Sequence, residues 1–172
     1  NSLSWLTANG VVDLGESESE GKAEKDAEKP ERTRFSEKRF GDAREDAALK
    51  SIAGAMFEVK VDSTHPLAYG FPTDTVPVFR RGTYHYQRPE NSYQTAGIYG
   101  DVIAGYVNDE NAKELQGTAA VFVVPVGKGR VIVLADNPVF RGYVRATEPF
   151  FTNAVYLGPS IRLPKSTNDE HD

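Results

Sequence analysis

The feature that most constrains the fold is a long apolar hairpin, the segment TAAVFVVPVGKGRVIVLAD at residues 118–136. Two runs rich in valine, isoleucine and leucine flank the turn sequence VGKGR, which predicts two antiparallel strands. Because the arms are almost entirely apolar, both of their faces are expected to be covered. The glycines of GKG suit a turn that needs positive φ, whereas a phosphate-binding loop needs a longer glycine spacing and a following helix.

Further strands and helices are expected on both sides of this hairpin. AMFEVKVD (residues 55–62) alternates apolar and polar residues, and TVPVFRRGTYHYQ (residues 75–87) contains a strand in which Pro77 favours a sheet edge or the strand's start. A short strand at Val102 to Tyr106 and a short helix follow. Strands covered on both sides and separated by short helices predict an α/β fold, a three-layer α/β/α sandwich.

The segment TEPFFTNAVYLG (residues 147–158) is typical of a capped helix. Thr147 suits the N-cap, a proline follows in the first turn, and Gly158 suits the end. The residues expected on its buried side are Phe150, Phe151, Ala154 and Val155.

The chain divides into four parts. Residues 1–14 are expected to form a helix of a truncated domain, residues 15–38 a charged low-complexity linker or loop, residues 39–164 the α/β domain, and residues 165–172 a disordered tail. The chain starts at Asn1 rather than methionine, so we expect it to be a piece of a longer protein.

Composition excludes several classes of function. The 172 residues include no cysteine, which excludes disulfides, thiolate metal sites and a cysteine nucleophile. The net charge of -5, with no basic stripe, argues against nucleic acid as a partner. No apolar run approaches the roughly 20 residues of a membrane span.

The histidines show no metal-binding spacing. None of His65, His85 and His171 belongs to an HxxE or HExxH pattern. His65 lies in THPLAYG, where a turn histidine bonded to the backbone is favoured over a ligand. A site that combines Asp62, His65 and His85, as a metal centre or as a stand-alone hydrolase, is the least favoured hypothesis, and no GxSxG elbow is present. No metal site is therefore expected in this chain.

The loop DNPVFRGY at residues 136–143 follows the apolar hairpin directly. Asp136 and Arg141 are candidates for an ion pair. One interpretation is a ligand site at the strand ends that uses Asp136, Asn137 and Arg141, joined by His65 and His85. The favoured interpretation is a structural latch that docks the last helix.

Three segments carry a resemblance to a known family: HPLAYGFPTDTVPVFRRG, GKGRVIVLADNPVFRGY and FFTNAVYLGPSI. They resemble the C-terminal region of large bacterial zinc carboxypeptidases, relatives of the carboxypeptidase-A metallopeptidases, in which a class I glutamine amidotransferase-like domain follows the peptidase domain. The resemblance covers about Ser2 to Leu6 and most of Ile52 to Arg162. It implies a flavodoxin-like, amidotransferase-like sandwich that is incomplete at its N-terminus and contains a late β-hairpin.

The resemblance also implies that the chemistry lies elsewhere. The peptidase's zinc ligands have no counterpart here, so zinc is expected in an upstream peptidase domain, and this chain is expected to hold no cofactor. An active amidotransferase needs a cysteine and a histidine in an HPE-like turn, and the matching turn here reads Asn137, Pro138, Val139. The base and its orienting acid are missing, which predicts a site without catalytic residues.

Two functions from different classes follow. The first is a non-catalytic accessory domain of a zinc metallocarboxypeptidase-like protein, supporting the peptidase domain, substrate access or homo-oligomer contacts. Such parents carry export signals, which implies a periplasmic or secreted location. The alternative is a saccharide- or peptide-binding module at the strand ends. Its aromatic surface would come from tyrosines and its donors from arginines: Tyr84, Tyr86, Tyr99, Tyr106, Arg80, Arg81 and Arg141.

Overall fold

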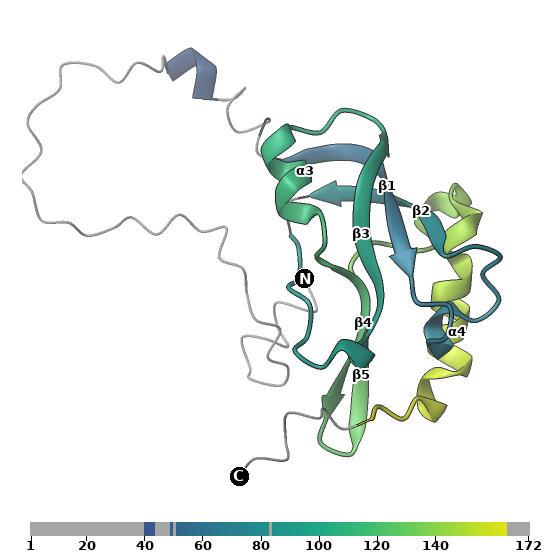
Figure 1. Cartoon of the computed structure of the whole chain (residues 1–172). Helices are drawn as coiled ribbons and strands as arrows, with labels where there is room; N and C mark the ends of the chain where they lie inside the picture. The colour runs from purple at the N-terminus through teal and green to yellow at the C-terminus, as the bar shows by residue number, and fades with distance from the viewer. Residues whose placement is uncertain (1–39, 44–48, 50, 83, 165–172) are drawn as a thin grey trace, which may run out of the picture.

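The computed structural model describes residues 40–43, 49, 51–82 and 84–164 (Figure 1). The expected helix at 1–14, the expected linker at 15–38 and the expected tail at 165–172 lie outside these residues. In the described part of the chain, five strands form one sheet in the order β2-β1-β3-β4-β5, and every pairing is antiparallel.

Turns and short helices connect and follow the strands. The strands are β1 (Ile52–Val61), β2 (Thr75–Gly82), β3 (Thr95–Ala104), β4 (Ala119–Val126) and β5 (Gly129–Leu134). The α-helices whose bounds lie within the described residues are α3 (Asp109–Leu115) and α4 (Glu148–Tyr156). Single 3₁₀ turns are η1 (Phe40–Asp42), η2 (Pro66–Ala68), η3 (Ser92–Gln94), η4 (Phe140–Gly142), η5 (Arg145–Thr147) and η6 (Gly158–Ser160).

Local sequence signals explain most of these strands. The predicted hairpin is confirmed, because β4 and β5 pair from Val121↔Leu134 to Val126↔Gly129 and Gly127 has φ +57°. β2 is an edge strand, as Pro77 indicated, since a proline cannot donate to a neighbouring strand. β3 is longer than predicted and begins at Thr95 rather than near Val102. Alanine and glycine weaken the strand pattern at its start.

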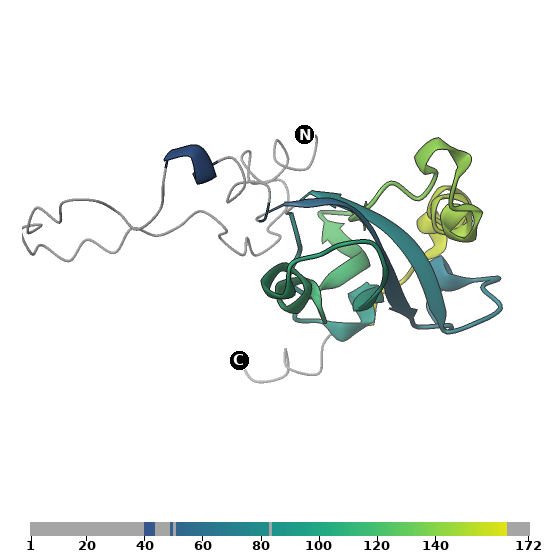
Figure 2. The ribbon, with the colours of Figure 1, turned by 90° about the horizontal axis from the view of Figure 1, so that it is seen from above.

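The fold is α/β, built on a curled antiparallel sheet with few helices. Figures 1 and 2 show α4 and α3 on opposite sides of this sheet. The larger part of the core lies between the sheet and α4, and it includes Phe57, Val59, Val78, Val123 and Phe150. β4 is also covered on its other face, where Ala119 and Phe122 pack against Tyr86. Its two-sided burial explains why its sequence is apolar throughout.

The helix α4 is oriented differently from the expected arrangement. Phe150 is buried as expected, but Phe151 and Val155 are exposed by 49% and 55%, so placing them on the buried side was wrong. Asn153 takes an inward position instead, and its Nδ2 donates to the backbone oxygens of Leu67 and Tyr69 at 3.0 and 2.8 Å. These two hydrogen bonds attach α4 to the η2 segment and determine which side of the helix faces the sheet.

Candidate functional site

A buried polar centre lies where the apolar hairpin ends. Asp136 follows β5, and its Oδ1 accepts from Nη1 of Arg80 on β2 at 3.3 Å. Its Oδ2 accepts from the Tyr99 hydroxyl on β3 at 2.5 Å, and Arg80 Nη1 also donates to that hydroxyl oxygen at 3.2 Å. The side chains of Arg80 and Asp136 are only 2% and 7% exposed. Three elements far apart in sequence therefore meet in one charged cluster, which we call the buried triad.

Burial governs the ionisation of the triad. Loss of hydration raises the pKa of Asp136, while the positive charge of Arg80 and the hydrogen bonds from Tyr99 and Arg80 lower it. Burial also raises the pKa of the Tyr99 hydroxyl well above its usual value, and the Asp136 charge adds to this shift. Tyr99 therefore remains a neutral donor. The guanidinium carbon of Arg80 also lies 5.3 Å from the centre of the Tyr99 ring.

The loop after Asp136 closes over the triad rather than opening a cleft. Asn137 Oδ1 accepts from the backbone N–H of Val139 at 3.0 Å. Thr147 Oγ1 lies 2.5 Å from the Pro138 carbonyl oxygen, to which it donates. The cavity beside Asp136 measures about 20 Å³, enough for roughly one water molecule. Ligand pockets usually measure at least about 300 Å³.

The expected pairing of Asp136 with Arg141 was wrong. Asp136 forms its ion pair with Arg80, while the guanidinium carbon of Arg141 lies 5.3 Å from the Phe140 ring centre. Arg141 has φ +51°, which an L-residue adopts at a cost of roughly 1–2 kcal/mol. Phe140 in turn stacks on Phe79 of β2 at 4.9 Å. Arg141 thus belongs to the exposed side of the loop, and Asp136 to the interior.

His65 is a turn residue bonded to the backbone, as expected. Its Nδ1 accepts from the Leu67 N–H at 3.1 Å and caps η2, while its buried Nε2 has no hydrogen-bond partner among the described residues. His85 is half-buried after β2. Within the described part of the chain, no group of three or more histidine, aspartate or glutamate side chains is arranged to hold a metal ion.

His65 predicts a pH dependence of stability. Burial lowers the pKa of His65, and the nearby Asp62 charge opposes this shift only partly. The unfolded chain therefore binds the proton more readily, so this contribution to stability is present above the unfolded pKa of about 6.5 and is lost as the pH falls. We expect urea unfolding to show falling stability from pH 7 to 5. His65→Asn, whose Oδ1 can still cap η2, should reduce that slope; an unchanged slope would show that His65 does not titrate as described.

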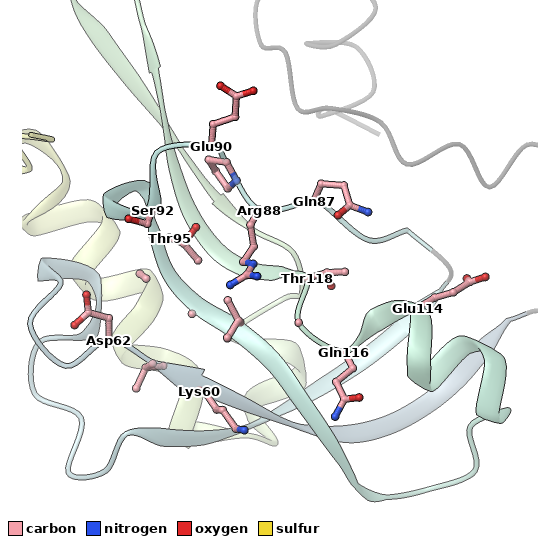
Figure 3. A pocket seen from close by; sticks show the side chains of 16 residues that line it. Lys60, Asp62, Gln87, Arg88, Glu90, Ser92, Thr95, Glu114, Gln116 and Thr118 are labelled. Atoms are coloured by element: carbon pink, nitrogen blue, oxygen red, sulfur yellow. The ribbon is translucent and has the colours of Figure 1, made fainter. Parts of the chain in front are cut away.

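A larger pocket lies on the opposite face of the sheet from α4, with a volume of about 820 Å³. We call it the strand-end pocket, because it is bounded by the end of β1, the start of β3 and the turn before β4. The segment 87–92 forms its remaining wall (Figure 3). Its polar lining residues are Lys60, Asp62, Gln87, Arg88, Glu90, Ser92, Thr95, Glu114, Gln116 and Thr118. None of the expected site residues Asp136, Asn137, Arg141, His65 and His85 lines it.

The expected aromatic surface is only partly present. Tyr84 and Tyr106 are exposed, but Tyr99 is buried in the triad and Tyr86 packs on Phe122 with ring centres 5.8 Å apart. Arg80 is likewise an interior residue, so treating Tyr99 and Arg80 as surface groups was wrong. The alternation of β2 contained the signal: Val76, Val78 and Arg80 are spaced by two and face the same side.

Comparison with protein families, with curated protein sequences and with solved structures found no match to this chain. Among the described residues, no helix is long and apolar enough to cross a membrane.

Proposed function

We propose that this chain is a non-catalytic accessory domain of a zinc metallocarboxypeptidase-like protein. One observation carries the non-catalytic part: both carboxylate oxygens of Asp136 are bonded inside the protein, to Arg80 and Tyr99, and the cavity beside Asp136 measures only about 20 Å³. A catalytic acid or base must reach its substrate within hydrogen-bond distance. The parent's zinc and its peptidase chemistry would reside in the preceding domain, and a periplasmic or secreted location would follow from the family resemblance.

The proposal also concerns the complete domain, of which the described strands would form one part. The antiparallel strands and the late hairpin would form one part of an amidotransferase-like, three-layer α/β/α sandwich, and the rest of its sheet would come from elsewhere in the parent. The edge strand β5 is the natural place for such a continuation, because no further strand pairs with it in the described residues.

The outer side of α4 supports a role in contacts with another domain. Phe151, Val155 and Tyr156 are 49%, 55% and 78% exposed, and they form the surface we call the α4 stripe. Exposed apolar and aromatic side chains on one helix commonly mark an interaction surface. Contact with the peptidase domain or with a second copy would cover this stripe.

The experiment pairs this chain with the peptidase domain of its parent, produced separately. The chain alone should release no C-terminal residues from peptides in the presence of zinc, and it should bind the peptidase domain. Phe151→Ser with Val155→Ser should weaken that binding at least about tenfold. Ile103→Ser, at an equally exposed position on β3, is the matched control. Zinc-dependent peptidase activity of this chain, or identical binding by both variants, would contradict the proposal.

A second candidate, a binding module, is favoured by the strand-end pocket. Its volume of about 820 Å³ falls within the usual range for ligand sites. Its lining contains no aromatic residue, which favours a peptide over a saccharide because sugar sites commonly use aromatic platforms.

A further inference from the structure

The strand-end pocket contains two cationic side chains, both of them exposed. Lys60 comes from the end of β1 and Arg88 from the wall segment 87–92. Within the described part of the chain, neither side chain forms an ion pair or hydrogen bond. Figure 3 shows the Arg88 side chain extending from the wall toward the middle of the pocket, above the strands. An arginine side chain can donate two parallel hydrogen bonds to a carboxylate.

The acidic residues of the pocket do not neutralise these cations. Asp62 Oδ1 accepts from the N–H and the hydroxyl of Thr64, at 2.9 and 2.6 Å, so its carboxylate is engaged in its own turn. Glu90 and Glu114 point away from the centre in Figure 3. The Arg88 guanidinium therefore lies in the middle of the pocket and Lys60 at its lower edge, while Glu90 and Glu114 give the pocket a negative rim. Such a rim repels ligands with several negative charges but tolerates a single carboxylate.

The floor suits a peptide main chain. Gly117 lines the pocket and nothing lies within 4 Å of where a Cβ would be, so a ligand backbone can approach the turn before β4 closely. The Gln116 amide nitrogen donates to Asp101 Oδ1 at 2.8 Å, which orients the amide and leaves its oxygen as an acceptor for a ligand N–H. The Thr95 hydroxyl is buried and has no partner among the described residues. A buried polar group without a partner often marks the position of an unseen ligand or water.

We propose that the strand-end pocket binds the carboxylate end of a peptide. Arg88 and Lys60 hold the terminal carboxylate, and Gln116 accepts a hydrogen bond from a main-chain N–H. This proposal rests on the second candidate function, a binding module, and names its ligand. It does not depend on whether the α4 stripe contacts another domain.

The test is a titration of the whole chain followed by amide chemical shifts. N-acetyl-dialanine has the free carboxylate, its C-terminal amide lacks that charge, and inorganic phosphate provides a compact anion of higher charge. We expect shifts at Thr95, Gly97 and Thr118 with N-acetyl-dialanine, and at least tenfold weaker binding of the amide. Arg88→Gln should weaken N-acetyl-dialanine binding to the same extent. Arg145→Gln, an exposed arginine outside the pocket, should leave it unchanged.

Three contrary results of this titration would overturn different parts of the proposal. Equal binding of the acid and the amide would overturn carboxylate recognition and leave a peptide-binding module in place. Tighter binding of phosphate would overturn the peptide end as the ligand. No shift in the pocket with any probe would overturn both this proposal and the binding-module candidate, without affecting the accessory role tested on α4.

Discussion

Replacing Arg80 by methionine is expected to lower the free energy of unfolding at pH 7 by about 3–5 kcal/mol. The substitution leaves Asp136 buried without its counter-ion, and the remaining partner, Tyr99, is neutral. Urea unfolding followed by circular dichroism measures the loss. The effect is large because the penalty comes from the stranded charge, whereas the intact ion pair has little net effect on stability.

The loss should also depend on pH, with a definite sign. Burial already raises the pKa of Asp136, and removal of Arg80 takes away the main influence that lowers it. At Asp136 the folded variant then binds a proton more readily than the unfolded chain, so the contribution of this residue to stability rises as the pH falls. The deficit relative to the original protein should therefore be smaller at pH 5 than at pH 7.

Two comparison variants test whether the loss of stability comes from the stranded Asp136 charge or simply from the removal of an arginine. Arg81→Met removes the exposed neighbour on β2, whose Nε donates to the Ala53 carbonyl, and should cost less than about 1 kcal/mol. Arg80→Met combined with Asp136→Leu and Tyr99→Phe removes the whole triad and should recover much of the loss. If Arg80→Met were as mild as Arg81→Met, the triad would not be the buried charge centre described above.

Phe57→Ala is expected to destabilise the protein by about 3–5 kcal/mol. Phe57 is fully buried at the centre of β1, and its ring packs edge-on against Tyr99 with centres 6.1 Å apart. Truncation leaves a cavity between the sheet and α4, and it removes one wall of the triad. Chemical denaturation at pH 7 gives the magnitude.

The neighbouring residue provides the matched control. Met56 precedes Phe57 on the same strand but faces the opposite side of the sheet and is only half-buried. Met56→Ala should therefore cost less than about 1.5 kcal/mol, well below the value for Phe57→Ala. Equal losses in the two variants would mean that the core does not lie between the sheet and α4.

Local patterns predicted most of the strands, although not the start of β3, and only the tertiary structure could reveal the site. The apolar runs around VGKGR predicted the β4–β5 hairpin, and Pro77 indicated either a sheet edge or the start of a strand, of which the edge is observed for β2. These features depend on residues that are close in sequence. The order of the five strands depends on pairings such as Val59↔Tyr99, which no local pattern encodes.

The buried triad illustrates the same limit. The sequence pointed to Asp136 as the polar residue after the hairpin and offered Arg141, the nearest arginine in sequence, as a candidate partner. Its true partner, Arg80, is 56 residues away along the chain. The orientation of α4 was also missed, because the polar Asn153 faces inward to bind two backbone carbonyls. A prediction that places only apolar residues on the buried side of a helix cannot identify a buried asparagine.

The central claim is that the buried triad is closed to solvent and has a structural role. Carboxyl labelling with a water-soluble carbodiimide and glycinamide, read out by peptide mass spectrometry on the folded chain, tests it most directly. Asp74 is exposed and serves as the internal reference. Asp136 should be labelled at least about a hundredfold more slowly than Asp74, because it reacts only after the loop opens. Labelling of both carboxyls at similar rates would contradict the claim and reopen Asp136 as a reactive group.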